Sequence, residues 1–253
     1  MIMEIVLNVV REKIRRKMLY ITTILGILVV AIFSTGTGTL TVGGKSMNDY
    51  YVLVPILINV LNFLNGAIAL AISCSTIPQE YERRTSHLIW SRGVSQSRYH
   101  MSLAAGNVLV SWISGVILYL TLGVFAVVNG YSEMLGRIAV ASLFMMLYAA
   151  CICMLTSALS IKIPTLFTGT IMVIILVCGA LRSALNLMTA ALTGFGGAVI
   201  KRTVLLIPNL AGISTQAGNL VQERPVNVHV IIMGLIVIWI AGLLVITLRR
   251  EEA

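Results

Sequence analysis

Long apolar runs separated by polar connections dominate this chain. The runs cover residues 19–42, 50–77, 101–128, 137–160, 165–187 and 228–248. Each has at least the roughly 20 residues that a helix needs to cross the hydrocarbon core of a bilayer. The pattern predicts an all-α polytopic membrane protein, a single transmembrane domain over residues 1–253 with six transmembrane helices.

Residues 1–18 follow a different pattern, amphipathic at first and then basic. Ile2, Val6 and Val9 belong to one apolar face, and several basic residues follow, up to Lys17. This pattern predicts an interfacial helix that lies among the lipid headgroups before the first span. A simple positively charged anchor for that span is compatible with the same residues.

The composition excludes a soluble globular domain. Hydrophobic types make up 58% of the 253 residues and charged types 11%, against about 45–50% and about 25% in soluble domains. The net charge of +9 comes from basic residues that lie beside the apolar runs. We therefore expect the lipid bilayer, and not a nucleic acid, to be their partner.

Lysine and arginine also predict the orientation of the chain. Most of the 18 lie before the first span, within residues 78–100, at Lys162 and after the last span. Because positive residues concentrate on the cytoplasmic side of membrane proteins, both termini are expected in the cytoplasm.

The longest connection, residues 188–227, lies on the opposite side in this orientation. It contains several glycines and Pro208, and its apolar pieces are too short or too rich in glycine to span. We expect short outer helices here, before the last span, covered by protein and not by lipid.

The chain lacks the residues that catalysis or ion coupling within a membrane uses. No Asp or Glu lies within a predicted span, whereas ion-coupled carriers place ionisable groups there. Cys151 and Cys153, two positions apart on a helix, point about 200° apart and cannot clamp one metal ion. Residues 43–46 end like a nucleotide-binding loop, but Thr39 stands where that loop requires glycine. We expect no catalytic site, no metal and no cofactor in this chain.

Polar side chains form a stripe on the second predicted span. Asn59, Asn62 and Asn65 fall within about 120° of one another around the helix. The stripe predicts either hydrogen bonds to neighbouring helices or the lining of a substrate path or subunit interface. Arg182, near the outer end of the fifth span, either extends to the headgroups or faces a cavity that holds an anionic group.

The predicted cytoplasmic segment, residues 78–100, combines dense charge with apolar residues. Its candidate contact residues are Glu80, Glu82, Arg83, Arg84, Leu88 and Trp90. A short amphipathic helix that docks a soluble partner has this arrangement, with Trp and Arg as anchors. An interfacial helix that rests on lipid has it equally, with Trp90 among the interfacial aromatic residues.

The run from Gln79 to Arg98 resembles the segment between the second and third spans of bacterial ABC-type export permeases. This six-span type-2 exporter family includes the permease of the nitrous-oxide-reductase maturation exporter and permeases of antibiotic and bacteriocin exporters. The family pattern is E-x-E-R/K-x-x-G-T, two or three apolar residues, and a small-residue-Pro-Val-Ser-R ending. Here Ser86 and Gly93 replace the usual glycine and proline, and Gln96-Ser97 precede the arginine. The basic N-terminus and the long outer segment, with Leu206-Ile207-Pro208-Asn209-Leu210, are also similar to that family.

The resemblance implies a function and a set of partners. The chain would be the permease subunit of an ATP-driven exporter in the bacterial cytoplasmic membrane, and not itself an enzyme. Its coupling helix, within residues 78–100, would fit a cleft in a separate ATPase. Two such ATPase subunits would bind the ATP and Mg²⁺, and a second permease copy or a similar permease would complete the complex.

Two other classes of function stay open at this stage. A membrane module that uses the same ATPase for signalling or release, without transport, would have the same coupling helix. An ATP-independent carrier or channel would not need that helix, and the missing mid-membrane charges disfavour it.

Overall fold

The computed structural model describes residues 2–36, 41–42, 45–46, 50–83, 90–91, 93–182, 202 and 208–250. In chain order the elements are α1 (Ile2–Arg15), α2 (Met18–Gly36), β1 (Thr41–Val42), β2 (Lys45–Ser46), α3 (Tyr50–Glu82), α5 (Gln96–Val128), η1 (Ser132–Met134), α6 (Leu135–Ser160), α7 (Thr165–Ala180), α10 (Leu210–Val221) and α11 (Val228–Thr247). The two-residue strands β1 and β2 pair antiparallel as a small hairpin.

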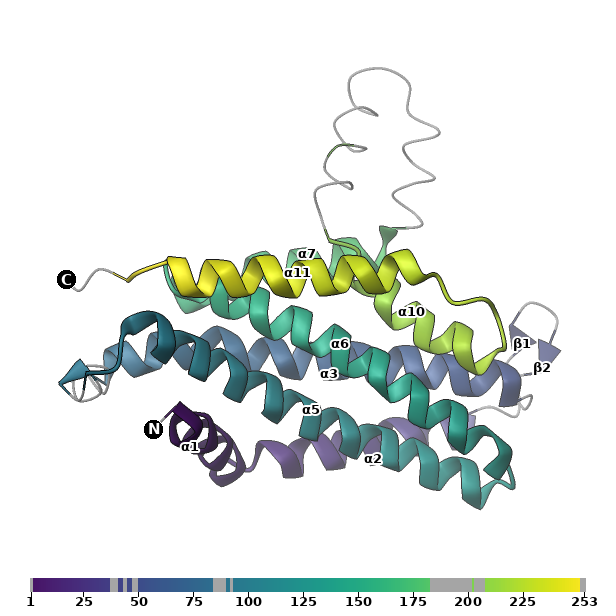
Figure 1. The fold of residues 1–253 in the computed structure, drawn as a ribbon. Helices are drawn as coiled ribbons and strands as arrows, with labels where there is room; N and C mark the ends of the chain where they lie inside the picture. The colour runs from purple at the N-terminus through teal and green to yellow at the C-terminus, as the bar shows by residue number, and fades with distance from the viewer. Residues whose placement is uncertain are drawn as a thin grey trace.

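The helices pack side by side into one elongated bundle (Figure 1). Both chain termini lie at one end, which we call the termini end, and the β1–β2 hairpin lies at the other, the hairpin end. α3, α5 and α6 contact one another and form the centre of the bundle. Their apolar core includes Leu57, Leu118 and Met145, whose side chains are fully buried.

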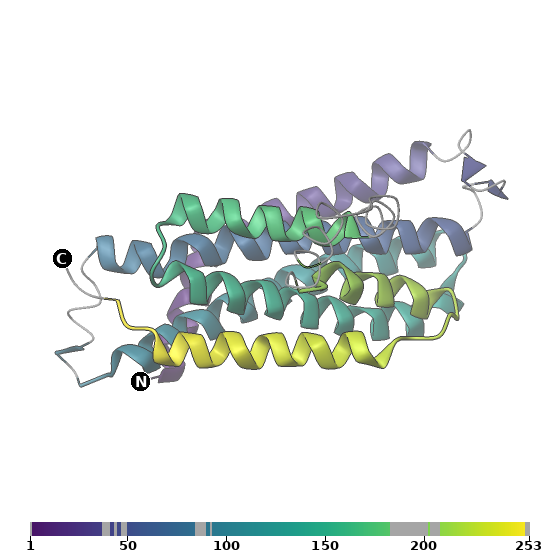
Figure 2. The ribbon, with the colours of Figure 1, turned by 90° about the horizontal axis from the view of Figure 1, so that it is seen from above.

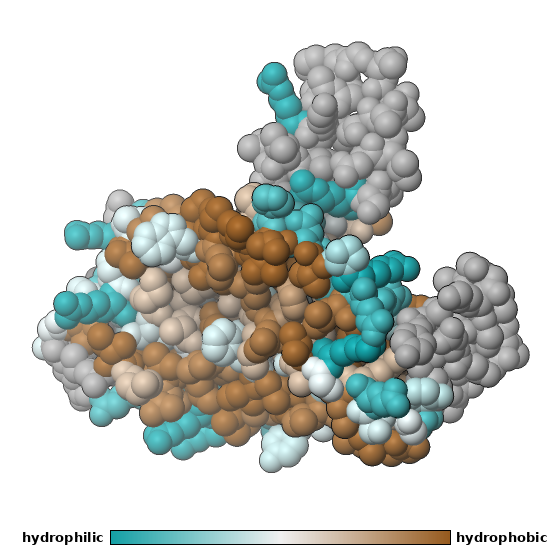
Figure 3. All heavy atoms as spheres, turned by 45° about the vertical axis from the view of Figure 1, so that its right-hand side comes forward, coloured by the Kyte–Doolittle hydropathy of each residue, from teal (hydrophilic) through white to brown (hydrophobic). Residues whose placement is uncertain are grey.

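The all-helical membrane class predicted from the sequence is confirmed. Among the described residues, four helical segments are long and apolar enough to cross a bilayer: Leu53–Glu82, Gln96–Val128, Ser132–Ser160 and Val228–Thr247. The bent pair of α1 and α2, which meet at 58°, makes a fifth if it is counted as one span. On the face shown in Figure 3, apolar residues form a broad band over the bundle, and hydrophilic residues gather toward its ends.

The predicted count of six full spans is not confirmed. The difference lies in α7, which has 16 residues and is too short for the length that a span requires. It ends at Ala180, whereas the apolar run predicted a fifth span as far as residue 187. Hydropathy alone gives no signal for a helix that ends inside an apolar run.

α3 and α5 are longer than predicted. Each has 33 residues, about 50 Å of helix, against a hydrocarbon core of about 30 Å. Residues 78–82 and 96–100, predicted as part of the cytoplasmic connection, continue these helices. The end of an apolar run indicates where contact with lipid ends. The helix itself can continue into polar surroundings, provided that its backbone hydrogen bonds still form.

α7 and α10 together extend along the bundle, although each covers only part of it. α7 starts at the termini end and extends for about 24 Å, and α10 extends for about 18 Å toward the hairpin end (Figure 2). A Cβ on Gly179 would lie 3.7 Å from Ala211, so the end of α7 meets the start of α10. The start of α10 lies well inside the bundle, because Ile213 packs against Gly234 of α11.

Short helices covered by protein were predicted within the outer segment, residues 188–227. Their predicted apolar pieces, residues 188–200 and 203–207, lie outside the described residues. Within the same segment, α10 is a helix that packs against α6 and α3. Leu210, Ile213, Ala217 and Val221 are each at most 1% exposed. Their spacing of three and four residues is that of one helix face, which the intervening polar residues obscured in the hydropathy pattern.

Candidate functional site

Hydrogen bonds fix the termini ends of α3 and α5 to each other. The Tyr99 hydroxyl of α5 donates to Glu80 Oε2 of α3 over 2.7 Å. Ser97, in the first turn of α5, donates to the Ile246 carbonyl oxygen of α11 over 2.6 Å. The two long helices therefore reach the connection between them, residues 83–95, as one unit braced by α11.

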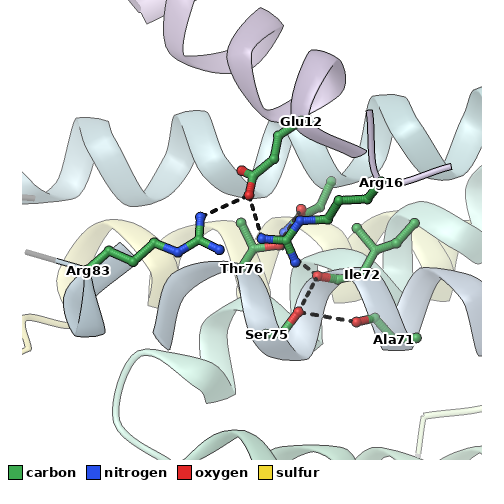
Figure 4. Close-up of polar contacts among 8 residues, drawn as sticks. Glu12, Arg16, Ala71, Ile72, Ser75, Thr76 and Arg83 are labelled. Atoms are coloured by element: carbon green, nitrogen blue, oxygen red, sulfur yellow. Dashed lines mark hydrogen bonds and ion pairs between the residues drawn. The ribbon is translucent and has the colours of Figure 1, made fainter. Parts of the chain in front are cut away.

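An ion-pair cluster fastens α1 to the end of α3 (Figure 4). Glu12 Oε1 accepts a hydrogen bond from Arg83 over 3.0 Å and another from Arg16 over 2.6 Å. Partial burial acts to raise the pKa of Glu12, but the two guanidinium groups outweigh it and hold that pKa below its usual value. Glu12 is therefore an ionised carboxylate at neutral pH, bound to both helices.

Lys13, the next residue, is also part of the contact between α1 and the bundle. Only 4% of it is exposed. Burial, and then the positive charge of Arg16, lowers its pKa. The predicted interfacial helix α1 therefore has a basic residue on the side that packs against the bundle, in addition to those on its exposed side.

Aromatic and polar side chains gather around Tyr81 near the end of α3. Its hydroxyl accepts a hydrogen bond from Gln96 Nε2 and bonds His100 Nε2, both over 2.7 Å. The Trp90 ring packs edge-on against the Tyr81 ring with centroids 5.9 Å apart. The Arg250 guanidinium lies over the Tyr81 ring, 4.9 Å from its centroid. The chain after α11 thus returns to the connection between α3 and α5.

The predicted partner-contact residues have different surroundings. Glu80 and Arg83 bond to α5 and α1, and Trp90 is half-buried against Tyr81. Glu82 is exposed at the end of α3. Arg84 and Leu88 lie outside the described residues. Two of the charged residues that were predicted to contact a partner, Glu80 and Arg83, therefore form bonds within the chain at this end of the bundle.

A second group of polar side chains lies inside the bundle and forms what we call the polar ladder. It consists of α3 and α5 residues that are at most 6% exposed: Asn62, Asn65, Ser73, Thr76, Asn107, Ser111, Ser114 and Tyr119. α3 and α5 run antiparallel. With increasing residue number, the ladder residues of α3 therefore lie closer to the termini end, and those of α5 lie farther from it.

Two rungs of this ladder are hydrogen-bonded. Tyr119 Oη donates to Asn62 Oδ1 over 3.0 Å. Thr76 Oγ1 lies 2.9 Å from Asn107 Oδ1 and donates to the Ile72 carbonyl oxygen over 2.7 Å. These bonds join α3 to α5 at two levels of the bundle.

Between these rungs the ladder has polar atoms with no hydrogen-bond partner among the described residues. They are Asn65 Oδ1, Asn107 Nδ2 and Ser114 Oγ, whereas the Ser73 and Ser111 hydroxyl groups lie within hydrogen-bonding reach of the Cys153 thiol of α6. An unsatisfied polar group costs several kcal/mol, on the order of a full hydrogen bond, at hydrocarbon depth. The α3–α5 contact is therefore incompletely paired in this arrangement.

The predicted asparagine stripe divides between the interior and the surface. Asn62 Nδ2 donates to Ser214 Oγ of α10 over 3.1 Å, and Ser214 Oγ donates to Asn59 Oδ1 over 3.4 Å. Asn65 is fully buried and donates to Met145 Sδ of α6. Asn59 is exposed. Arg182 follows α7 and is half-buried.

The cysteines and metal-binding residue types form no site in the described part of the chain. No three His, Cys, Asp or Glu residues there lie close enough to hold a metal ion. Cys151 Sγ donates to the Gly234 carbonyl oxygen of α11, whereas Cys153 Sγ faces the Ala69 carbonyl oxygen of α3. The two thiols point to different helices, as their spacing predicts.

Sequence reasoning missed several residues of both groups. Tyr81, Gln96 and His100 come together because α3 and α5 pack against each other, and Arg250 joins them because the chain after α11 returns to this place. Ser214 pairs with the asparagines only because α10 lies within the bundle. The spacing of Asn107, Ser111 and Ser114, four and three residues apart, is a sequence signal that could have indicated a polar face on α5.

Comparison with known proteins does not identify the chain. No protein-family model and no curated protein sequence matches it.

Proposed function

We propose that the chain is the membrane-spanning permease subunit of an ATP-binding-cassette exporter. Separate ATPase subunits would bind ATP and Mg²⁺ and hydrolyse the ATP, and the permease would use that work to move a substrate out of the cytoplasm. In this proposal the termini end faces the cytoplasm, in agreement with the distribution of Lys and Arg.

The observation that carries this proposal is the α3–α5 pair. Its two 33-residue helices are about 20 Å longer than the hydrocarbon core is thick, and α3 ends and α5 begins at the termini end (Figure 2). Glu82 and Arg98 are exposed there. A rigid helix pair with charge at its tip suits contact with a soluble partner.

The internal contacts of this tip suggest how force would pass from a partner into the bundle. Glu80 links the tip to α5, and Arg83 links it to Glu12 of α1. A displacement of the tip would therefore move α1, α3 and α5 together. In the proposal Glu82 contacts the ATPase, whereas Glu80, Arg83 and Trp90 hold the tip in position.

The polar ladder fits a protein that alternates between two states. Its unpaired hydroxyl and amide groups would find new partners when α5 shifts along α3. Such a shift between discrete pairings is one of the ways in which packed helices switch conformation. We propose that closure of the ATPases drives this movement between inward-open and outward-open states.

The second permease subunit would cover the exposed face of α3. Asn59, Phe63 and Ala67 are exposed on it, beside a groove of about 300 Å³ that α3 forms with α7. A polar Asn59 facing lipid is unfavourable, and a partner helix would remove that cost. In the proposal, Asn59 is therefore the residue of the asparagine stripe that lies at the subunit interface.

The test is the recovery of an ATPase with the full-length chain. The tagged wild-type protein is purified in mild detergent from its own membranes, and we expect a P-loop ATPase to co-purify. Glu82→Ala should reduce that recovery about fivefold, the effect of losing an important interface residue. Glu133→Ala is the matched control, because Glu133 is equally exposed but lies near the hairpin end. The proposal fails if no ATPase is recovered with the wild type, or if both variants recover as much as the wild type.

A further inference from the structure

A small cleft at the termini end is not used by the proposed function. It has a volume of about 250 Å³ and is lined by Trp90, Val94, Gln96 and Arg250. Three of these residues belong to the connection and the first turn of α5, and the fourth lies after α11. The cleft is thus built where two distant parts of the chain, residues 90–96 and Arg250, meet.

Arg250 brings a positive charge to this cleft, and no described residue pairs it with an opposite charge. Its carbonyl oxygen accepts a hydrogen bond from Gln96 Nε2 over 2.9 Å, which fixes its backbone. Its guanidinium lies on the Tyr81 ring. Nη1 is buried with no hydrogen-bond partner, and no carboxylate among the described residues forms an ion pair with it. Buried and half-buried cations are normally paired, so the cleft lacks an anion.

The depth of the cleft indicates which anion reaches it. The 20 residues of α11 extend for about 30 Å, the thickness of the hydrocarbon core. Arg250 follows the end of α11 by three residues, and Ser97 is bonded to Ile246 near that same end. The cleft therefore lies at the level of the headgroups, where phospholipid phosphates are found. Trp90 and Tyr81 are aromatic residues of the kind that concentrate at this level.

We propose that this cleft binds the phosphate group of a phospholipid headgroup from the leaflet at the termini end. The Arg250 guanidinium pairs with the phosphate as a charge-assisted hydrogen-bond donor, and the lipid glycerol end lies toward Val94 and Trp90. Basic pockets beside membrane helices bind anionic headgroups in this way. This inference is independent of the proposed ATPase partner, because it needs only the chain and the bilayer.

The experiment measures lipid binding to the full-length protein in detergent by native mass spectrometry. The probes are phosphatidylglycerol, a galactosyl diacylglycerol that has no phosphate, and inorganic phosphate. Arg250→Gln should weaken phosphatidylglycerol binding about tenfold, the effect of losing a hydrogen bond to a charged group. Arg249→Gln is the matched control, since Arg249 is exposed and does not line the cleft. It should bind phosphatidylglycerol about as well as the wild type, and all three proteins should bind the galactolipid equally.

A second variant keeps the test decisive if Arg250→Gln does not fold. Gln96→Leu retains the charge of Arg250 but removes the amide that fixes its backbone and lines the cleft, and it should also weaken phosphatidylglycerol binding. Equal losses in the Arg249 and Arg250 variants would overturn the proposal in favour of unspecific surface charge. Displacement of phosphatidylglycerol by millimolar inorganic phosphate would instead identify a site for free phosphate. If neither probe binds but Arg250→Gln lowers the recovery of a co-purified protein, the anion is a carboxylate of that protein and the lipid assignment is wrong.

Discussion

At the scale of single residues, Asn62 is the member of the polar ladder whose side chain bonds to two other helices. Its side chain bonds to α5 through Tyr119 and to α10 through Ser214. Both partners are buried, so their hydroxyl groups have no water to replace a lost bond. Asn59, one helical turn away, is exposed and bonds only at the longer distance of 3.4 Å.

Replacing Asn62 should therefore destabilise the protein more than replacing Asn59. Asn62→Ala leaves the Tyr119 hydroxyl without its acceptor and removes the donor to Ser214 Oγ, and it should lower the free energy of unfolding by about 1–3 kcal/mol. Asn59→Ala should change it by less than about 0.6 kcal/mol, the average for a hydrogen bond between membrane helices. Thermal unfolding of both variants in the same detergent measures the difference, and equal effects would contradict this role of Asn62.

Glu12 makes the attachment of α1 dependent on pH. Its pKa in the folded protein lies below the ordinary value of 4.5, so its ionised form favours the folded state above that pH. This contribution is lost as the pH falls through the lowered pKa. It amounts to at most about 1 kcal/mol, because the side chain is 35% exposed and screened by solvent.

Thermal unfolding of the wild type and of Glu12→Gln between pH 3 and pH 7 measures this dependence. The wild type should be the more stable protein at neutral pH, and the difference should shrink as the pH falls below 4.5 and through the lowered pKa of Glu12. Glu133→Gln, which removes an exposed carboxylate near the hairpin end, should show no such dependence. A difference between wild type and Glu12→Gln that stays constant over this pH range would mean that packing, and not charge, holds α1 in place.

At the scale of elements, α1 is held against α5 by a close contact as well as by charge. Gly106 of α5 faces Val9 of α1, and a Cβ on Gly106 would lie 2.7 Å from the Val9 Cβ. Val9 is branched at that atom and cannot rotate it away. The approach of the two helices therefore depends on the absence of a side chain at position 106.

Gly106→Ala should push α1 away from the bundle. We expect a loss of about 1–3 kcal/mol from overpacking, even though alanine favours helices over glycine by about 1 kcal/mol. Gly136→Ala in α6 is the control, because a Cβ there meets no described atom within 4 Å, and it should be neutral or slightly stabilising. The measurements are thermal stability and the rate at which a protease releases the N-terminal residues. Unchanged release in Gly106→Ala would show that α1 does not depend on this contact.

The sequence predicted the elements better than it predicted their ends. The helical class, the amphipathic N-terminal helix and the placement of α3, α5, α6 and α11 follow from apolar runs, which report burial in lipid or protein. The last turn of α3 and the first turn of α5 were missed, since they extend beyond the apolar region and are held by Glu80 and Arg83. Short helices were expected in the segment that contains α10, but its position was not predicted, because its apolar residues alternate with Ser, Thr, Gln and Asn.

The candidate site was predictable only in part, and for a related reason. Charge density drew attention to residues 78–100, and the structure places Glu82 at an exposed position there. Local pattern cannot show that Arg83 pairs with Glu12, 71 residues away along the chain, or that Arg250 stacks on Tyr81. Contacts between distant segments depend on the topology of the whole bundle.

At the scale of the whole molecule, the feature with the widest consequence is the meeting of α7 and α10. The bundle itself holds Gly179 beside Ala211, so the chain between them has only a short gap to close, whatever its length. The entropy of closing such a connection grows with the logarithm of its length, about 0.6 kcal/mol for each doubling. This junction is therefore a point at which the fold can accept inserted sequence at a low thermodynamic cost while its helices keep their packing.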